Sequence, residues 1–196
     1  MSQERFGLRH GGGATELVVA TGKAQWIADE LARWTAGRTV FVVTAMPVWR
    51  LHGEALAPLA AAAARWQVLE VEDGESAKSL AVAERLWRTL ARAGGRRDSR
   101  LIAFGGGSVG DLAGFVAGCF LRGIAFCQVP TTAIAQVDAA VGGKTAVNLP
   151  EAKNGVGLFH HPERVLSDPA FLATLPRRDR RAGLVEVVKM GTLLEP

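Results

Sequence analysis

Apolar and polar positions fall into two kinds of segment along the chain. Short apolar runs rich in branched side chains alternate with longer stretches whose apolar residues recur at helical spacing. This alternation is typical of βαβ units, which build a parallel sheet covered by helices on both faces. Helices are expected at residues 24–34, 48–65, 77–93 and 109–121. Strands are expected at residues 16–20, 39–44, 68–71, 101–104 and 125–129.

The regular alternation ends after Ala133. Two short extended segments at 145–149 and 165–167 flank an expected loop at 150–157. Asp168 with Pro169 suits a helix start, because proline is favoured in the first turn. A longer helical pattern follows at 178–194. We therefore predict a poorly ordered start at residues 1–14, an α/β domain at 15–176, and the beginning of an all-helical second domain, cut short, at 177–196.

Composition indicates an ordinary globular protein, and its modest positive charge suits anionic small molecules as well as nucleic acid. Apolar residues make up 48% and charged residues 21%, and the net charge is +4. Tyrosine is absent and no aromatic residues interleave with the arginine clusters, so the pattern of nucleic-acid binding is missing. No run approaches the roughly 18 apolar residues of a membrane span, and the start lacks a secretory signal pattern. Cys119 and Cys127 are expected to be buried free thiols, which predicts a cytoplasmic protein.

A glycine-rich turn, GGGSVGD at residues 105–111, follows one expected strand and opens the next helix. Glycine lets the backbone approach a ligand, and a helix N-terminus offers unpaired N–H groups to phosphate. The spacing is not the G-x-G-x-x-G dinucleotide fingerprint, because Gly110 follows Gly107 and Asp111 takes the next place. The turn therefore indicates either a nucleotide phosphate site or a tight strand–helix connection. Thr131 and Thr132 follow the neighbouring strand and are expected at the same sheet edge.

A second glycine motif, GGKT at 142–145, resembles the end of a phosphate-binding loop of the Walker type. That loop requires glycine at position 138, which is Asp138 here, so the motif is excluded. Asp138, Lys144, Lys153 and Asn154 form one polar segment. It is either a surface loop or an anion site in which lysines act as point charges.

Two further polar groups have alternative explanations. Glu186 and Lys189 lie three residues apart on one helix face among apolar neighbours. Either they form a surface ion pair, or the Glu186 carboxylate points inward and serves as a metal ligand or an acid–base group. The side chains of the adjacent residues His160 and His161 point in different directions in an extended chain. We therefore expect both histidines to be loop residues and not metal ligands. The sequence shows no complete metal site.

The chain resembles dehydroquinate synthases and the wider family of sugar-phosphate cyclases. The resemblance covers nearly the whole chain from about residue 16. It implies a Rossmann-like, doubly wound fold and an NAD- and zinc-dependent carbon–oxygen lyase. Such an enzyme converts the phosphorylated sugar acid DAHP to 3-dehydroquinate in the shikimate pathway. The matching strings are DGESAKSL (73–80), GGGSVGDLAGF (105–115), RGIAFCQVPTT (122–132), AQVDAAVGGKTAVN (135–148), KNGVGLFHHP (153–162), TLP (174–176) and RAGLVEVVKMG (181–191).

The resemblance assigns residues to two adjoining sites. Glu75 and Lys78 would hold the adenosine part of NAD, and Glu186 would be one of three zinc (or cobalt) ligands. The other cofactor contacts implied are Gly106, Gly107, Asp111, Thr131, Thr132, Lys144, Lys153, Thr174 and Leu175. The substrate contacts implied are Arg122, Asp138, Lys144, Asn154 and Lys189.

Two departures from the family pattern bear on function. Ala45 and Pro47 occupy positions where the family carries cofactor-binding Asp and Asn, and neither can replace them in a hydrogen bond to ribose. The remaining zinc ligands, two histidines, belong to a domain that would follow Pro196, so the fragment alone is expected to be inactive. The family implies a homodimer for the full-length protein. Two alternatives stay open: a cyclase that makes a cyclitol, and a non-catalytic NAD-binding module.

Overall fold

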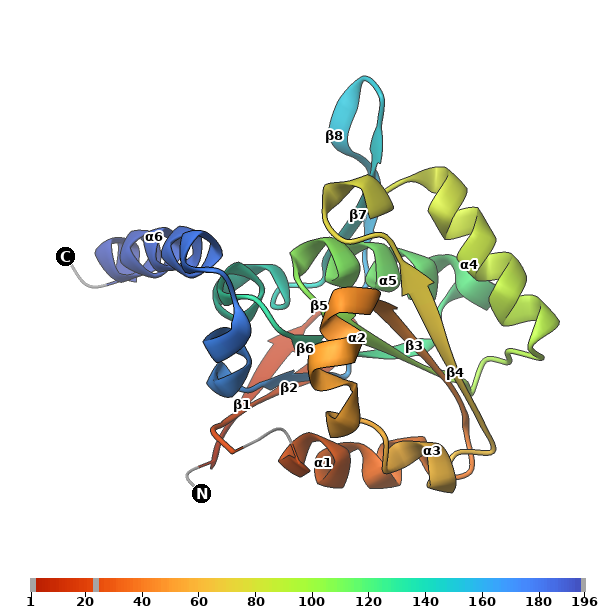
Figure 1. Cartoon of the computed structure of the whole chain (residues 1–196). Coiled ribbons are helices and arrows are strands. Elements are labelled where there is room, and N and C mark those ends of the chain that lie inside the picture. The colour runs from red at the N-terminus through yellow and green to blue at the C-terminus, as the bar shows by residue number, and fades with distance from the viewer. Residues whose placement is uncertain (1–2, 23–24, 195–196) are drawn as a thin grey trace.

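The computed structural model describes residues 3–22 and 25–194 (Figure 1). Its strands are β1 Gln3–His10, β2 Gly13–Ala20, β3 Thr39–Ala45, β4 Arg65–Val71, β5 Arg100–Gly105, β6 Ala125–Pro130, β7 Lys144–Leu149, β8 Ala152–Phe159 and β9 Arg164–Ser167. Its α-helices are α1 Gln25–Thr35, α2 Met46–His52, α3 Leu59–Ala62, α4 Leu80–Arg92, α5 Gly107–Cys119 and α6 Arg177–Leu194. Short 3-10 or π turns are η1 Gly53–Ala55, η2 Glu75–Ala77, η3 Phe120–Arg122, η4 Ala135–Ala139 and η5 Pro169–Thr174.

A seven-stranded sheet in the order β1-β2-β9-β6-β5-β3-β4 forms the centre of the molecule. In this order every neighbouring pair from β2 across the sheet to β4 is parallel, and the edge strand β1 pairs with β2 in the antiparallel direction. Helices α4 and α5 pack on one face, and α1, α3 and η5 pack on the other (Figure 1). The two faces are both apolar along β3, where Phe41 and Val43 face one core and Val40 and Val42 the other. The predicted doubly wound α/β fold is confirmed.

The start of the chain differs from the expectation of poor order over residues 1–14. Residues 3–10 form β1, whose register with β2 runs from Gln3 opposite Ala20 to His10 opposite Gly13. Residues 1 and 2 lie outside the described residues. Polar, glycine-containing sequence does not exclude an edge strand, because one side of such a strand faces water.

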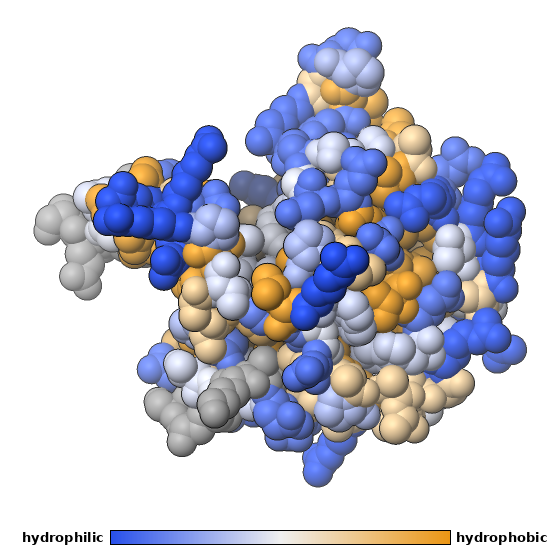
Figure 2. Space-filling model, viewed as in Figure 1, coloured by the Kyte–Doolittle hydropathy of each residue, from blue (hydrophilic) through white to orange (hydrophobic). Residues whose placement is uncertain are grey.

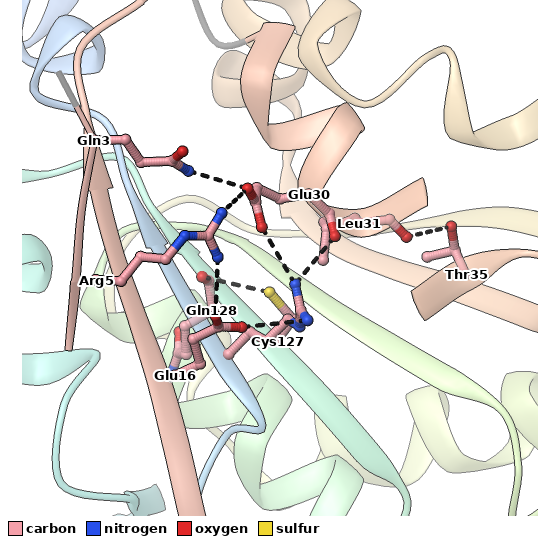
Figure 3. A network of polar contacts seen from close by, with 9 residues as sticks. Gln3, Arg5, Glu16, Glu30, Leu31, Thr35, Cys127 and Gln128 are labelled. Atoms are coloured by element: carbon pink, nitrogen blue, oxygen red, sulfur yellow. Dashed lines mark hydrogen bonds and ion pairs between the residues drawn. The ribbon is translucent and has the colours of Figure 1, made fainter. Parts of the chain in front are cut away.

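A polar network fastens this hairpin to the rest of the sheet (Figure 3). Arg5 donates to Glu16 at 2.9 Å and also to Glu30 of α1, and Gln3 donates to Glu30 at 3.0 Å. Arg164 of β9 pairs with Glu16 at 3.2 Å and with Glu30 at 3.5 Å. Burial acts to raise the pKa of Glu30, but the hydrogen bonds from Arg5 and Gln3 outweigh it and lower that pKa.

Other expected elements shift for local reasons. The helix predicted over 48–65 is divided into α2, η1 and α3. The ring of Trp49 lies where a side chain on Gly53 would be, and Pro58 precedes α3. Helix α4 begins at Leu80, where the Ser79 hydroxyl accepts a hydrogen bond from the Val82 N–H at 3.3 Å. The expected loop over 150–157 is largely strand β8, paired with β7 in a hairpin that projects from the body (Figure 1).

The cysteines differ from each other. Cys127 is buried in β6, as expected, and burial raises the pKa of its thiol. Cys119 is exposed, because it is the last residue of α5.

Helix α6 agrees with the predicted helix over 178–194, and Gly183 packs directly on Ala133. No helix among residues 3–22 and 25–194 has the length and apolarity needed to cross a membrane.

Helix α5 lies very close to its neighbours because glycine recurs on one of its faces. A Cβ at Gly110 would meet Gln128 Oε1 at 2.6 Å, and one at Gly114 would meet Thr145 Cγ2 at 2.4 Å. Farther along, a Cβ at Gly118 would meet Leu158 at 2.6 Å. These contacts let β6 and the β7–β8 hairpin lie directly against the helix.

Replacing Gly114 by alanine is expected to lower the free energy of unfolding by about 2 kcal/mol, in a urea titration followed by circular dichroism. Thr145 is buried and donates to Leu158 O at 2.9 Å, so it cannot move aside cheaply. The overpacking cost, about 3 kcal/mol, exceeds the roughly 1 kcal/mol gained in helix propensity. The matched control is Gly191→Ala in α6, where nothing lies within 4 Å. It is expected to be neutral or stabilising, and equal losses in both variants would contradict the packing account.

A histidine stack connects the β1–β2 turn to the segment after β8. The rings of His10 and His161 are parallel within 7°, with centroids 3.7 Å apart. The His161 ring also covers Gly143, where a Cβ would approach within 2.6 Å. Burial, and then the positive charges of His10 and His160, lower the pKa of His161.

The lowered pKa of His161 predicts a loss of stability in mild acid. The unfolded chain takes up this proton at a higher pH than the folded chain, so stability falls as the pH drops below about 6.5. Thermal unfolding at about pH 7.5 and about pH 5.5 should show a lower Tm at the acid pH, and His161→Gln should narrow that difference. An unchanged difference in the variant would contradict the expectation.

Candidate functional site

The candidate site is a cleft along the edge where the parallel strands end. It consists of two adjoining pockets of about 670 Å³ and 430 Å³. Both are lined by Gly74, Gly107, Ser108, Thr132 and Asp179. In Figure 2 hydrophilic side chains border the notch between the projecting α6 and the β7–β8 hairpin, whose residues line the larger pocket.

The glycine turn opens onto this cleft at the N-terminus of α5. Gly106 is the N-cap and provides no side-chain cap, so the first N–H groups of the helix are left for a ligand. A Cβ on Gly106 would meet Thr132 Cγ2 at 3.0 Å, and one on Gly107 would meet Ala139 at 3.3 Å. The Thr131 N–H donates to Gly105 O at 2.9 Å, which joins the ends of β6 and β5. The turn therefore has the shape and polarity of a phosphate site.

Lys78 occupies the floor of the larger pocket and is only 3% exposed. Its amine donates to Asp111 Oδ2 at 2.6 Å and to Asn154 Oδ1 at 2.5 Å, and it lies 3.5 Å from Glu75 Oε1. Burial raises the pKa of Asp111, and the hydrogen bond from Lys78 partly opposes this. The Lys78 amine thus lies close to two carboxylates inside the cleft, those of Asp111 and Glu75.

Asn148, which sequence reasoning missed, connects the same groups from β7. It donates to Glu75 Oε1 at 2.9 Å and accepts from the Asn154 N–H at 2.7 Å. Lys153 lies 3.8 Å from Glu75 Oε1. Asn148 has no signal in the sequence, because it reads as one polar residue of an alternating strand.

The smaller pocket is lined by Pro47, Thr174 and Leu175. His52, also missed from the sequence, contacts Thr174 Oγ1 at 2.8 Å, and burial lowers its pKa. Ala45 is fully buried at the end of β3 and does not line this pocket.

The structure places Glu75 and Lys78, which the family resemblance assigns to the adenosine part of NAD, at the larger pocket. Both residues line the larger pocket, beside Asp111 and Asn154, and neither lines the smaller one. The reason is the close packing of η2 against α5 and β7, which sequence spacing does not show.

The substrate-side residues are only partly brought together. Asp138 lies exposed on η4 and lines the larger pocket. Lys144 begins β7 and lines a neighbouring pocket of about 350 Å³ with Asp111 and Asn154. Arg122 lies apart from them, beyond the C-terminal end of α5, a 13-residue helix about 20 Å long whose other end meets the cleft. Within this chain, Arg122 does not join the site.

Glu186 and Lys189 form an ion pair of 2.7 Å on α6. The hydrogen bond to Glu186, its charge and the charge of Asp138 raise the pKa of Lys189, so it stays cationic at neutral pH. Across residues 3–22 and 25–194, no group of three His, Cys, Asp or Glu residues could hold a metal ion. Glu186 therefore has no companion ligands in the described part of the chain, and His160 and His161 form no such group either.

Comparisons with known proteins point to one family. Residues 68–182 match the family model of the 3-dehydroquinate synthase N-terminal domain. The chain is 50% identical to 3-dehydroquinate synthase of Solibacter usitatus (strain Ellin6076), over 86% of its length and 48% of the relative's. It is 46% identical to that of Pelotomaculum thermopropionicum, over 90% of its length and 48% of the relative's. The chain spans about half the length of the curated relatives it matches.

Solved structures of related cyclases share the fold. A 2-deoxy-scyllo-inosose synthase complexed with carbaglucose-6-phosphate, NAD⁺ and Co²⁺ has a TM-score of 0.82 at 27% identity, covering 95% of this chain and 51% of that one. The 2-epi-5-epi-valiolone synthase of Streptomyces hygroscopicus subsp. jinggangensis, with NAD⁺ and Zn²⁺ bound, has a TM-score of 0.80 at 33% identity, covering 89% and 48%. The sequence matches and the fold together show that this chain belongs to the 3-dehydroquinate synthase family.

Proposed function

We propose that the chain forms the NAD-binding half of a 3-dehydroquinate synthase. The complete protein would convert DAHP to 3-dehydroquinate and phosphate. The observation that carries this proposal is one continuous cleft that joins the uncapped N-terminus of α5 to Asp138, Lys153 and Asn154. A dinucleotide and an anionic substrate can lie side by side there.

The cleft has the features that NAD requires. The first N–H groups of α5 would bind the pyrophosphate, and the missing side chains at Gly106 and Gly107 let it approach. The smaller pocket would take the adenosine, against Pro47, Thr174 and Leu175. The nicotinamide half would then lie in the larger pocket near Asp111 and Lys78. NAD supplies a hydride acceptor when bound.

The polar groups around the larger pocket would bind and orient the substrate. Lys144, Lys153 and Lys189 are exposed cations that attract its phosphate and carboxylate. Asn154 offers amide donors, and Asp138 can accept a hydrogen bond from a substrate hydroxyl. Arg122 is left out of this arrangement, because it lies at the other end of α5.

The described residues do not contain a complete set of metal ligands. The two related cyclase structures hold Co²⁺ or Zn²⁺, whereas Glu186 in this chain is paired with Lys189. No group of three potential ligands occurs among the described residues, so these residues do not fit a metal by themselves. We propose that the complete protein supplies the other ligands, and we derive no step through the ion. A homodimer and a cytoplasmic location are likewise proposals from the family.

Identity favours 3-dehydroquinate synthase over the cyclitol branch. The chain is 46–50% identical to the two 3-dehydroquinate synthases above but 27% and 33% identical to the two cyclitol-forming synthases. Ala45 and Pro47 are the features that favour the alternative of a non-catalytic NAD-binding module. Of the two positions, only Pro47 lines the cleft.

The chain itself is expected to bind NAD⁺ in isothermal titration calorimetry, and Gly107→Val should weaken that binding by about ten-fold or more. Valine would lie between the α5 N-terminus and Ala139, in the space proposed for the pyrophosphate; a ten-fold loss corresponds to about 1.4 kcal/mol. The control is Gly7→Val on β1, where nothing lies within 4 Å, and its affinity should equal that of the unaltered chain. Equal affinity in both variants would contradict the proposed pyrophosphate position.

The reaction is tested on the longest polypeptide that the gene encodes. It is expected to release phosphate from DAHP only with NAD⁺ and a divalent metal, and removal of the metal by EDTA should stop the release. A colorimetric phosphate assay measures this. Activity on sedoheptulose 7-phosphate in place of DAHP would move the protein to the cyclitol branch. NAD⁺ binding with no activity on either compound would favour the non-catalytic module.

A further inference from the structure

The surroundings of Lys78 combine burial with contacts to three separate elements. Its amine, a donor of three hydrogen bonds, faces Glu75 on η2, Asp111 on α5 and Asn154 on β8. The lysine is almost fully buried, and no buried side-chain N or O atom among the described residues lacks a hydrogen-bond partner. Such a position is costly for an ammonium group unless its partners are held in place.

Lys78 links the β7–β8 hairpin to the body beside the packing of the hairpin on α5. It forms its own two-stranded sheet, separate from the main sheet, and projects beside the η2 connection (Figure 1). A two-stranded hairpin by itself is only marginally stable in water. The Asn148 N–H donates to Lys78 O at 2.8 Å, and the Lys78 side chain reaches Asn154 on the second strand. Both strands of the hairpin are therefore joined to Lys78.

The contact also decides which end of the Asn154 amide faces the cleft. Lysine can only donate, so the oxygen of Asn154 must point at Lys78 and the NH₂ group must point the other way. Asn154 has φ +53°, a left-handed conformation that surrounding contacts must hold. The Asn154 N–H to Asn148 supplies one such contact, at 2.7 Å, and Lys78 supplies the other.

We propose that Lys78 is a positioning residue that presents the Asn154 amide to the substrate as a donor and couples it to Asp111 on the cofactor side. This role differs from the expected contact with the adenosine part of NAD. The proposal depends on the proposed function in one respect, which is that the cleft residue Asn154 contacts an anionic group of the substrate. Lys78 would thereby connect the cofactor side and the substrate side of the larger pocket.

The first test is a double-mutant cycle with Lys78→Met and Asn154→Gly, which keeps the left-handed backbone and removes the amide. Binding of inorganic phosphate to the NAD⁺-saturated chain is measured by calorimetry. Each single variant is expected to weaken binding about ten-fold, as for a hydrogen bond to a charged group, and the double variant no further. Multiplied losses of about a hundred-fold would overturn the proposal. Lys78→Met combined with Lys189→Met, which removes a separate cation on α6 proposed to bind the substrate, is the matched pair whose losses should multiply.

The second test is amide hydrogen exchange without ligand, which measures the positioning independently of any function. Lys78→Met should speed exchange about ten-fold or more over residues 148–156 and leave β3, β5 and β6 at the rates of the unaltered chain. Lys78→Arg, which keeps a cationic donor, should restore part of the protection, and it also serves if the methionine variant fails to fold. Unchanged exchange in the hairpin of the folded methionine variant would overturn the proposal, as would protection in the arginine variant no better than in the methionine variant. Absence of NAD⁺ binding to the unaltered chain would instead count against the proposed function.

Discussion

The close contact between α5 and its neighbours is the constraint on which the rest of the structure depends. Gly110, Gly114 and Gly118 present no side chain where Gln128, Thr145 and Leu158 approach. The helix can therefore lie directly against both β6 and the β7–β8 hairpin, which approach the same glycine-bearing face. Because α5 cannot shift, its uncapped N-terminus is held at the edge where the parallel strands end. The place of the proposed phosphate site follows from this packing.

The same packing creates the polar centre of the cleft. With the hairpin against α5, the η2 segment after β4 meets both, and Lys78 is enclosed between them. A buried ammonium group is stable only with acceptors around it, and Asp111, Asn154 and Glu75 provide them. The elements that surround the cleft are thus connected by charge as well as by apolar contact.

The cleft is open on the side of α6, where the apolar residues Leu184, Val185 and Val188 are exposed. This helix carries Glu186 and Lys189 and touches the body through Gly183 on Ala133. The relatives named above are about twice as long as this chain. The described residues provide a cleft with the exposed cations Lys144, Lys153 and Lys189 around it.

The sequence by itself determined the α/β class, the doubly wound sheet, the glycine turn at the start of α5 and the family. These features follow from local patterns: apolar runs and helical spacing for the sheet and its helices, glycine spacing for the turn, and ordered motifs for the family. Tertiary structure alone decided that residues 3–10 form an edge strand, that 152–159 pair with β7, and that Cys119 is exposed. It also decided that Lys78 lies in the larger pocket and that Arg122 lies beyond the C-terminal end of α5. The physical reason is that strand pairing and the burial of a charge depend on residues distant in the chain, such as Thr145 against Gly114 and Asn154 against Lys78, which no local pattern records.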